Sequence, residues 1–148
     1  MPTKTNREIY NERILKAPVD KVYQAFSNPS HLKVWWGPEG YTNTFHEFDL
    51  RPGGKWSLTM HSPTKANYEN ASIFKTIKPQ KLVSMSRTSH PIFDMEIGFE
   101  KLNDSETQIS FRMIFDCPNT CEKIRVFAGP KNEENFDRLE KELPNVEI

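Results

Sequence analysis

The sequence predicts a single α+β domain over residues 1–148, in which one antiparallel sheet and a C-terminal helix enclose an apolar cavity. A chain of 148 residues is long enough for one buried core but not for two. Apolar residues follow a period of two from Tyr41 to about Cys117, which is the spacing of half-buried strands. On both sides of that region the spacing is helical, so helices are expected to flank most of the sheet.

The N-terminal part is expected to form one strand and two short helices. The strand runs from Glu8 to Leu15, and a helical pattern opens at Val19. Asn28-Pro29 breaks this first helix, because proline cannot continue it. Ser30 is the expected N-cap of a second short helix, which ends before a Gly-Pro turn.

The middle of the chain is expected to add six strands, each bounded by turn residues. These strands run from Thr44 to Leu50, from Trp56 to Met60, from Asn67 to Ile77, from Leu82 to Thr88, from Phe93 to Glu100 and from Gln108 to Phe115. Simple alternation places Phe48 on the same face as His46. Because the connections are short, neighbouring strands are expected to be antiparallel.

The C-terminal segment is expected to form a helix that lies over the sheet. Helical spacing begins after Pro118, and Gly129-Pro130 is expected to kink or break the helix. Phe136 and Leu139 continue the apolar stripe until Pro144 closes it. A single helix over an antiparallel sheet must lay its apolar stripe on the inner face of the sheet.

Charge and hydropathy exclude several classes of partner. Lysine plus arginine number 20 and aspartate plus glutamate also number 20, so no net charge attracts a nucleic acid or an anionic membrane. No apolar run approaches the roughly 20 residues that span a bilayer, and the N-terminal residues form no hydrophobic signal segment. We therefore expect a cytoplasmic protein that neither binds nucleic acid nor inserts into a membrane.

Cysteine spacing gives no disulfide framework and no complete metal site. Cys117 and Cys121 lie in the string D-C-P-N-T-C, which lacks the second ligand pair of a structural zinc site. The four histidines show no ligand spacing with them. Free thiols are the favoured interpretation, and a redox pair or half of a metal site are the alternatives. Neither a metal nor a cofactor is expected.

No local motif supports catalysis. The chain has no P-loop, no G-x-S-x-G and no H-E-x-x-H, and Gly53-Gly54 is expected to be a turn between strands. Asp94 and Glu96 share a strand face and would form a carboxylate pair only if that face lined a pocket. A solvated face paired with Arg112 is the favoured interpretation, and His46 is expected to be exposed. No catalytic residue is therefore assigned.

Bulky apolar side chains are the candidate ligand-binding residues. Aromatic and methionine side chains dominate both cores and ligand pockets, so both interpretations of these residues stay open. The candidates are Trp35, Trp36, Phe48, Trp56, Met95, Phe111, Met113 and Phe136.

Several strings along the chain resemble a known family. They are A-P-V-D-K-V-Y-Q-A-F at 17–26, W-W-G-P at 35–38, D-L-R-P-G-G-K-W at 49–56, K-P-Q-K-L-V at 78–83 and F-D-R-L at 136–139. This combination is similar to the heat-shock-protein ATPase activator branch of the START-like (SRPBCC) superfamily. The resemblance implies a helix-grip fold, in which a curved sheet of about seven strands wraps around a long C-terminal helix with an apolar cavity between them.

The resemblance implies three functional hypotheses. The first is binding of a small hydrophobic ligand in the cavity. The second is a cyclase-like or hydrolase-like enzyme for a polyketide or aromatic substrate, in which His46 or the Asp94 and Glu96 pair is the acid or base. The third is regulation of a chaperone ATPase by protein contact, as in relatives where this domain accompanies another. An exposed strand edge also leaves a homodimer open.

Overall fold

The computed structural model, which describes residues 6–147, contains one sheet and three α-helices. The strands are β1 (Glu8–Leu15), β2 (Thr42–Phe48), β3 (Lys55–His61), β4 (Asn67–Lys78), β5 (Leu82–Arg87), β6 (Asp94–Asn103) and β7 (Glu106–Ile114). The helices are α1 (Val19–Ser27), α2 (Pro29–Trp35) and α3 (Pro118–Glu142), with a final 3-10 turn, η1 (Leu143–Asn145). The predicted α+β helix-grip fold is confirmed, while the expected domain boundaries at residues 1 and 148 lie outside the described part of the chain.

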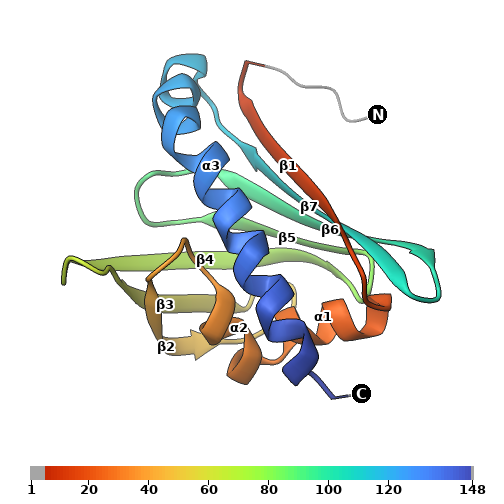
Figure 1. Cartoon of the computed structure of the whole chain (residues 1–148). Helices are drawn as coiled ribbons and strands as arrows, with labels where there is room; N and C mark the ends of the chain where they lie inside the picture. The colour runs from red at the N-terminus through yellow and green to blue at the C-terminus, as the bar shows by residue number, and fades with distance from the viewer. Residues whose placement is uncertain (1–5, 148) are drawn as a thin grey trace.

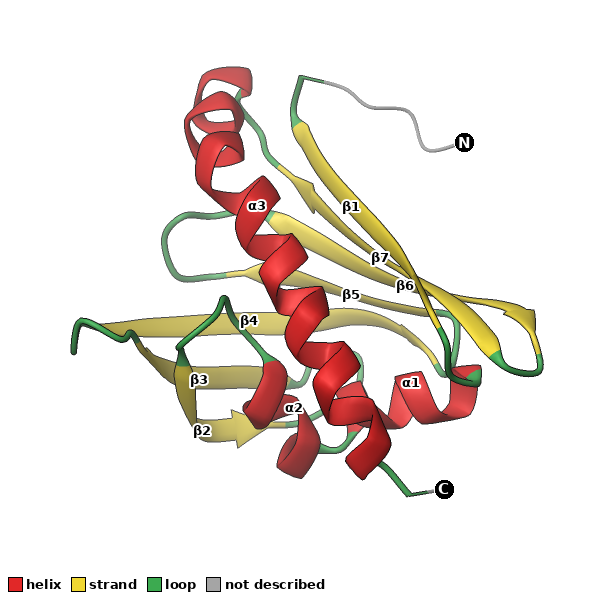
Figure 2. Cartoon of the chain, in the orientation of Figure 1, coloured by secondary structure: helices red, strands yellow, loops and turns green. Residues whose placement is uncertain are grey.

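The seven strands form one curved antiparallel sheet in the order β1-β7-β6-β5-β4-β3-β2. Strands β2 to β7 pair with their neighbours in sequence, and β1 closes the order by pairing with β7. Figure 1 shows α3 crossing one face of this sheet, and α1 and α2 lie near the C-terminal end of α3. The helices in Figure 2 therefore form a single layer over that face, which is the inner face of the molecule.

The inner face carries the main apolar core. Ile97 of β6 and Phe111 of β7 are cross-strand partners, and both are fully buried. The residues before and after each of them along its own strand face outward. Phe136 and Leu139 of α3 belong to the same core cluster. A smaller cluster, built on Met113, lies under the beginning of α3. The helix therefore buries its stripe as expected.

A β-bulge in β2 changes the predicted face of Phe48. Phe45 pairs with Leu58 and Glu47 pairs with Ser57, so His46 is an extra residue between them. The bulge returns Phe48 to the inner face beside Phe45, with 5.9 Å between their ring centroids. The expected sharing of a face by Phe48 and His46 is therefore wrong, since simple alternation does not allow for an inserted residue.

The second helix begins two residues earlier than expected. Asn28, rather than Ser30, is the N-cap, and its Oδ1 accepts a hydrogen bond of 3.0 Å from the Ser30 backbone N–H. Pro29 occupies the first helical position, where the missing N–H would have no helical partner in any case.

Of the kink or break expected at Gly129-Pro130, the break is wrong, because helix α3 continues through this position. Proline inside a helix costs about 3 kcal/mol, because it removes one backbone hydrogen bond and crowds the preceding turn. Tertiary contacts hold the helix on both sides of this position. Asn11 of β1 donates from Nδ2 to the Gly129 carbonyl at 3.1 Å, and Phe136, nearly two turns later, is fully buried.

Candidate functional site

A cavity of about 610 Å³ opens between α3 and the sheet, at the end where the β3–β4 and β5–β6 connections lie. We call it the α3 cavity. Six parts of the chain line it: the loop between α2 and β2, strands β3, β4 and β5, the connection from β5 to β6, and α3. The lining residues are Pro38, Tyr41, Met60, Asn67, Tyr68, Glu69, Asn70, Arg87, His90, Pro91, Phe127 and Lys131.

The apolar wall of the α3 cavity consists of large side chains that the core does not cover. Met60 and Tyr68 are directly paired across β3 and β4, and the Tyr68 ring centroid lies 6.4 Å from that of Tyr41. Tyr68 is 51% exposed, and Phe127 on the opposite side is 65% exposed. Exposed aromatic rings on both sides of one hollow can hold an apolar molecule between them.

Arg87 supplies a cationic group at the edge of this wall. Its Nε donates to the Ser89 carbonyl at 3.2 Å and its Nη2 donates to the His90 carbonyl at 3.3 Å. The guanidinium also lies over the Phe93 ring, 5.6 Å from the centroid. Burial lowers the pKa of Arg87 to about 10, because desolvation disfavours the charged form. Within residues 6–147, Arg87 has no carboxylate partner.

Arg138 of α3 fixes the loop that forms one rim of the cavity. Its Nη1 donates to three consecutive carbonyl oxygens, those of Trp36, Gly37 and Pro38, at 2.9 to 3.1 Å. Its Nη2 donates to the carbonyl oxygens of Val34 and Tyr41 at 2.6 and 2.9 Å. Burial lowers the pKa of Arg138 as well. One side chain thus holds both ends of the α2–β2 loop against the helix.

The family model for activator of Hsp90 ATPase homolog 1-like proteins matches residues 16–143 of the chain. The chain belongs to this family. The predicted family resemblance is therefore confirmed over most of the sequence. No curated protein matches the chain.

Solved structures of similar shape support the helix-grip fold of this family member. A protein from Nitrosomonas europaea is 19% identical, with a TM-score of 0.87 and coverage of 97% of both chains. A protein from Arthrobacter aurescens is 17% identical, with a TM-score of 0.87 over 97% of this chain and 90% of that one. An AHSA1 protein from Silicibacter pomeroyi is 17% identical, with a TM-score of 0.73 over 93% and 98%. At these identities the likeness concerns the fold.

The eight predicted ligand-binding residues lie in the packed core rather than on the wall of the α3 cavity. Five of them are linked by ring contacts with centroid separations of 4.6 to 5.8 Å: Trp36, Phe48, Trp56, Phe111 and Phe136. We call these five rings the aromatic core. Trp35 is buried beside them and donates from Nε1 to the Ala25 carbonyl at 2.9 Å.

The two predicted methionines are buried near the same interface. Met95 belongs to the main cluster, and Met113, its cross-strand partner, belongs to the smaller one. All eight residues thus lie between the inner face of the sheet and the helices, although they do not form one site. Their role in ligand binding stays a prediction.

The residues that line the cavity were missed because four of them lie in connections between elements and most of the others are polar residues at strand ends, where no periodic pattern marks a pocket. Arg87 is the exception with a visible signal. Val83 and Met85 face inward from β5 and are buried, and alternation along the strand turns Arg87 in the same direction. A charged residue that continues an apolar strand face is a recognisable departure from the pattern.

The candidate acid and base residues lie on the outer surface. His46 is exposed and its Nε2 lies 2.7 Å from Thr59 Oγ1. Asp94 accepts a 2.6 Å hydrogen bond from Ser86, and Glu96 lies 3.5 Å from the Arg112 guanidinium. None of the three lines the α3 cavity. None of these three residues is therefore placed to act as an acid or base inside the α3 cavity.

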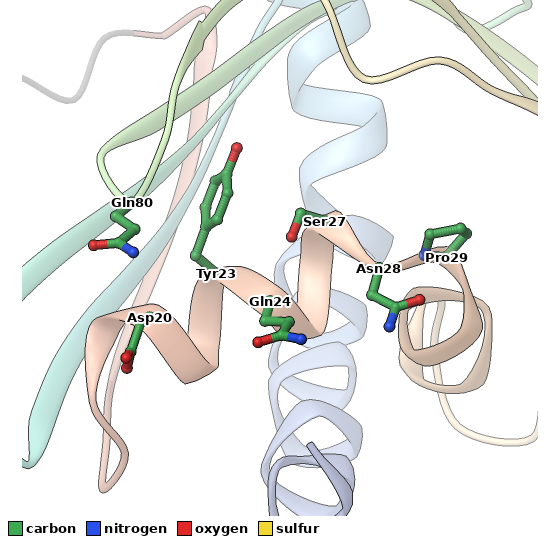
Figure 3. A pocket seen from close by; sticks show the side chains of 7 residues that line it. All are labelled: Asp20, Tyr23, Gln24, Ser27, Asn28, Pro29 and Gln80. Carbon is green, nitrogen blue, oxygen red and sulfur yellow. The ribbon is translucent and has the colours of Figure 1, made fainter. Parts of the chain in front are cut away.

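A second hollow of about 640 Å³ is an open groove beside α1. Figure 3 shows that its lining side chains come from α1 and the start of α2, with Gln80 facing them. Most of these groups are polar. The Tyr23 ring packs edge-on against Phe99, 5.2 Å between centroids, so the largest apolar group in the groove is already in contact with the core. The α3 cavity is therefore the better candidate for an apolar ligand.

Other features restrict the chemistry of the described chain. Over residues 6–147, no cluster of three or more histidine, cysteine, aspartate or glutamate side chains is arranged to hold a metal ion. None of the helices in that range has the length and apolar character needed to cross a membrane. Cys117 and Cys121 are both free thiols at the start of α3, the first exposed and the second buried.

Proposed function

We propose that this family member binds a small hydrophobic molecule in the α3 cavity. The observation that supports this function is the pair of exposed aromatic walls, Tyr68 on β4 and Phe127 on α3, on either side of a 610 Å³ hollow. Burial of apolar surface contributes about 25 cal/mol per Å², so a ligand that covers both rings gains affinity mainly by desolvation.

We place the ligand above the aromatic core rather than within it. Phe111 and Phe136 are fully unexposed, and Trp56 is only 2% exposed. Protein interiors are packed as densely as organic crystals, so a molecule that entered the core would have to displace whole rings. In this proposal the exposed rings make the direct contacts, and the packed core limits how deeply a ligand can enter.

A fluorescence titration with N-phenyl-1-naphthylamine, a neutral apolar probe, tests this function. The chain offers a matched pair of variants, because Val126 and Phe127 are adjacent, are both more than 60% exposed, and only Phe127 lines the cavity. We expect saturable binding that Phe127→Ala weakens about 3- to 10-fold and Val126→Ala leaves unchanged. Absence of saturable binding, or equal effects of the two substitutions, would refute the proposal.

Native mass spectrometry of protein purified from its own host then identifies the natural ligand class. The fraction of protein that retains a small molecule should be lower for the Phe127→Ala variant and unchanged for Val126→Ala. The two alternative hypotheses, an enzyme and a chaperone regulator, remain without matching geometry in the α3 cavity. The chaperone contact, a homodimer and a cytoplasmic location all stay predictions.

A further inference from the structure

We infer that the ligand of the α3 cavity is an apolar acid, whose anionic group binds the Arg87 guanidinium while its apolar body lies between Tyr68 and Phe127. This inference rests on the proposed function and narrows the ligand class from any hydrophobic molecule to one that carries a carboxylate, sulfonate or similar anion.

The position of Arg87 carries the inference. Its side chain extends from the inner face of β5, as do the buried side chains of Val83 and Met85, and it lines the cavity. A guanidinium has five N–H donors. Two of its nitrogen atoms donate to carbonyl oxygens, those of Ser89 and His90, and both acceptors are uncharged. Donors are therefore available for a ligand.

The other charged groups around the cavity favour an anion. Lys131 lines the cavity from α3 and makes no ion pair among the described residues. Glu69 is the one carboxylate among the lining residues, but it accepts a 2.7 Å hydrogen bond from Thr59 and lies 3.9 Å from His46. Thr59 and His46 are on the outer side of β3 and β2, so this carboxylate is engaged away from Arg87.

Partial burial makes an unmatched guanidinium unfavourable. Moving a charge out of water costs free energy unless a partner of opposite charge offsets the loss. The pKa of Arg87, although lowered to about 10 by burial, leaves the group protonated at neutral pH. A carboxylate matches the planar guanidinium with two parallel hydrogen bonds, which is the strongest arrangement available to it.

A matched pair of probes tests the inference. 1-Anilinonaphthalene-8-sulfonate and N-phenyl-1-naphthylamine have the same ring system and differ by one sulfonate. We expect the unmodified protein to bind the sulfonated probe about tenfold more tightly, because a charge-assisted hydrogen bond favours it. Arg87→Met should abolish this preference while the affinity for the neutral probe stays within about twofold.

Two controls separate a specific effect from general electrostatics. Arg51→Met makes the same substitution at a side chain that is 72% exposed and does not line the cavity, so the preference should be unchanged. Arg87→Lys retains the charge without the planar fork, so the preference should be intermediate. Circular dichroism of each variant verifies that it is folded before binding is compared.

The outcomes distinguish this inference from the proposed function. If the neutral probe binds and responds to Phe127→Ala, but the sulfonate preference is missing or survives Arg87→Met, the anionic ligand is refuted and the apolar cavity stands. If neither probe binds saturably, both proposals fail. Should Arg87→Met not fold, Arg87→Lys decides, since an undiminished preference in that variant would overturn the inference.

Discussion

Phe111 at the centre of β7 and Phe136 on α3 lie with their ring centroids 4.6 Å apart, and neither ring is exposed. This contact packs the C-terminal part of α3 against β7, the second strand in the sheet order. The interface is closed at that point, so a hollow between α3 and the sheet must lie elsewhere along the helix. The α3 cavity lies beside Phe127 and Lys131, on the N-terminal side of Phe136 along α3.

Replacing Phe136 by alanine should therefore destabilise the fold strongly. Loss of a buried phenylalanine costs about 3–5 kcal/mol, because the removed ring leaves a void in the core. Phe127→Ala, the same substitution at an exposed site of the same helix, should change the free energy of unfolding by no more than about 0.5 kcal/mol. Urea unfolding of both variants measures the difference, and equal losses would contradict this placement of α3.

Arg138→Met should loosen the rim of the cavity. The substitution removes the donors of five carbonyl oxygens between Val34 and Tyr41, and a carbonyl left without a partner costs about 1–3 kcal/mol when it is buried. Amide hydrogen exchange should accelerate in residues 34–41 and stay unchanged in β6. Arg51→Met, at an exposed arginine, is the control and should leave exchange in both regions unaltered.

Two glycine-to-alanine substitutions should differ strongly in their effect on stability. A Cβ at Gly54 would overlap the backbone carbonyl oxygen of Asp49, which cannot move aside without opening the β2–β3 turn. Apart from its chain neighbours and the backbone of α3, a Cβ at Gly129 would meet no heavy atom within 4 Å. Gly54→Ala should therefore destabilise the protein strongly. Gly129→Ala should change the free energy of unfolding by less than about 1 kcal/mol, because the helical preference of alanine is offset by crowding from the Pro130 ring. Thermal unfolding of the two variants measures the difference.

The two cysteines should react at very different rates. Hydrogen bonds from the backbone of Thr120 and Asn119 lower the pKa of the exposed Cys117 thiol, whereas burial raises the pKa of Cys121. More Cys117 is then thiolate at a given pH than in the unfolded chain, so alkylation should begin at a lower pH when the protein is folded.

Iodoacetamide treatment followed by peptide mass spectrometry measures this difference. The folded protein should take up one adduct, at Cys117, and Cys121 should be alkylated only after unfolding in urea. Rapid labelling of Cys121 in the native protein would show that the start of α3 opens readily.

The positions of most strands along the sequence could be predicted, because alternation and turn residues are local signals. Phe93 to Glu100 illustrates this, since its apolar and charged residues separate cleanly onto two faces. The inserted residue at His46 could not be predicted, because a bulge depends on the partner strand. The continuity of α3 through Pro130 depends in the same way on contacts from β1, which compensate for a strong local helix breaker.

The aromatic core could be predicted as a set of inward-facing residues, but the cavity could not. Packing decides whether an inward ring fills space or borders it, and packing is a property of the assembled layers. Tyr41 and His90 reach the cavity from connections whose paths no periodicity describes. Arg87 could have been found from the alternation along β5, because a cation follows two apolar residues on the inward-facing side of the strand.

The pairing of β1 with β7 has a consequence for the nascent chain. Glu8 pairs with Ile114 and Leu15 pairs with Thr107, so among the described residues the sheet neighbour of β1 is a strand that is synthesised much later. Until β7 and α3 have been synthesised, Ile9 and Leu15 lack the strand and the helix that bury them in the folded protein. Apolar side chains and an unpaired strand edge therefore stay exposed during translation, when a partly folded chain can aggregate or bind a chaperone. The sheet can therefore pair β1 and bury its apolar side chains only after β7 and α3 have been synthesised.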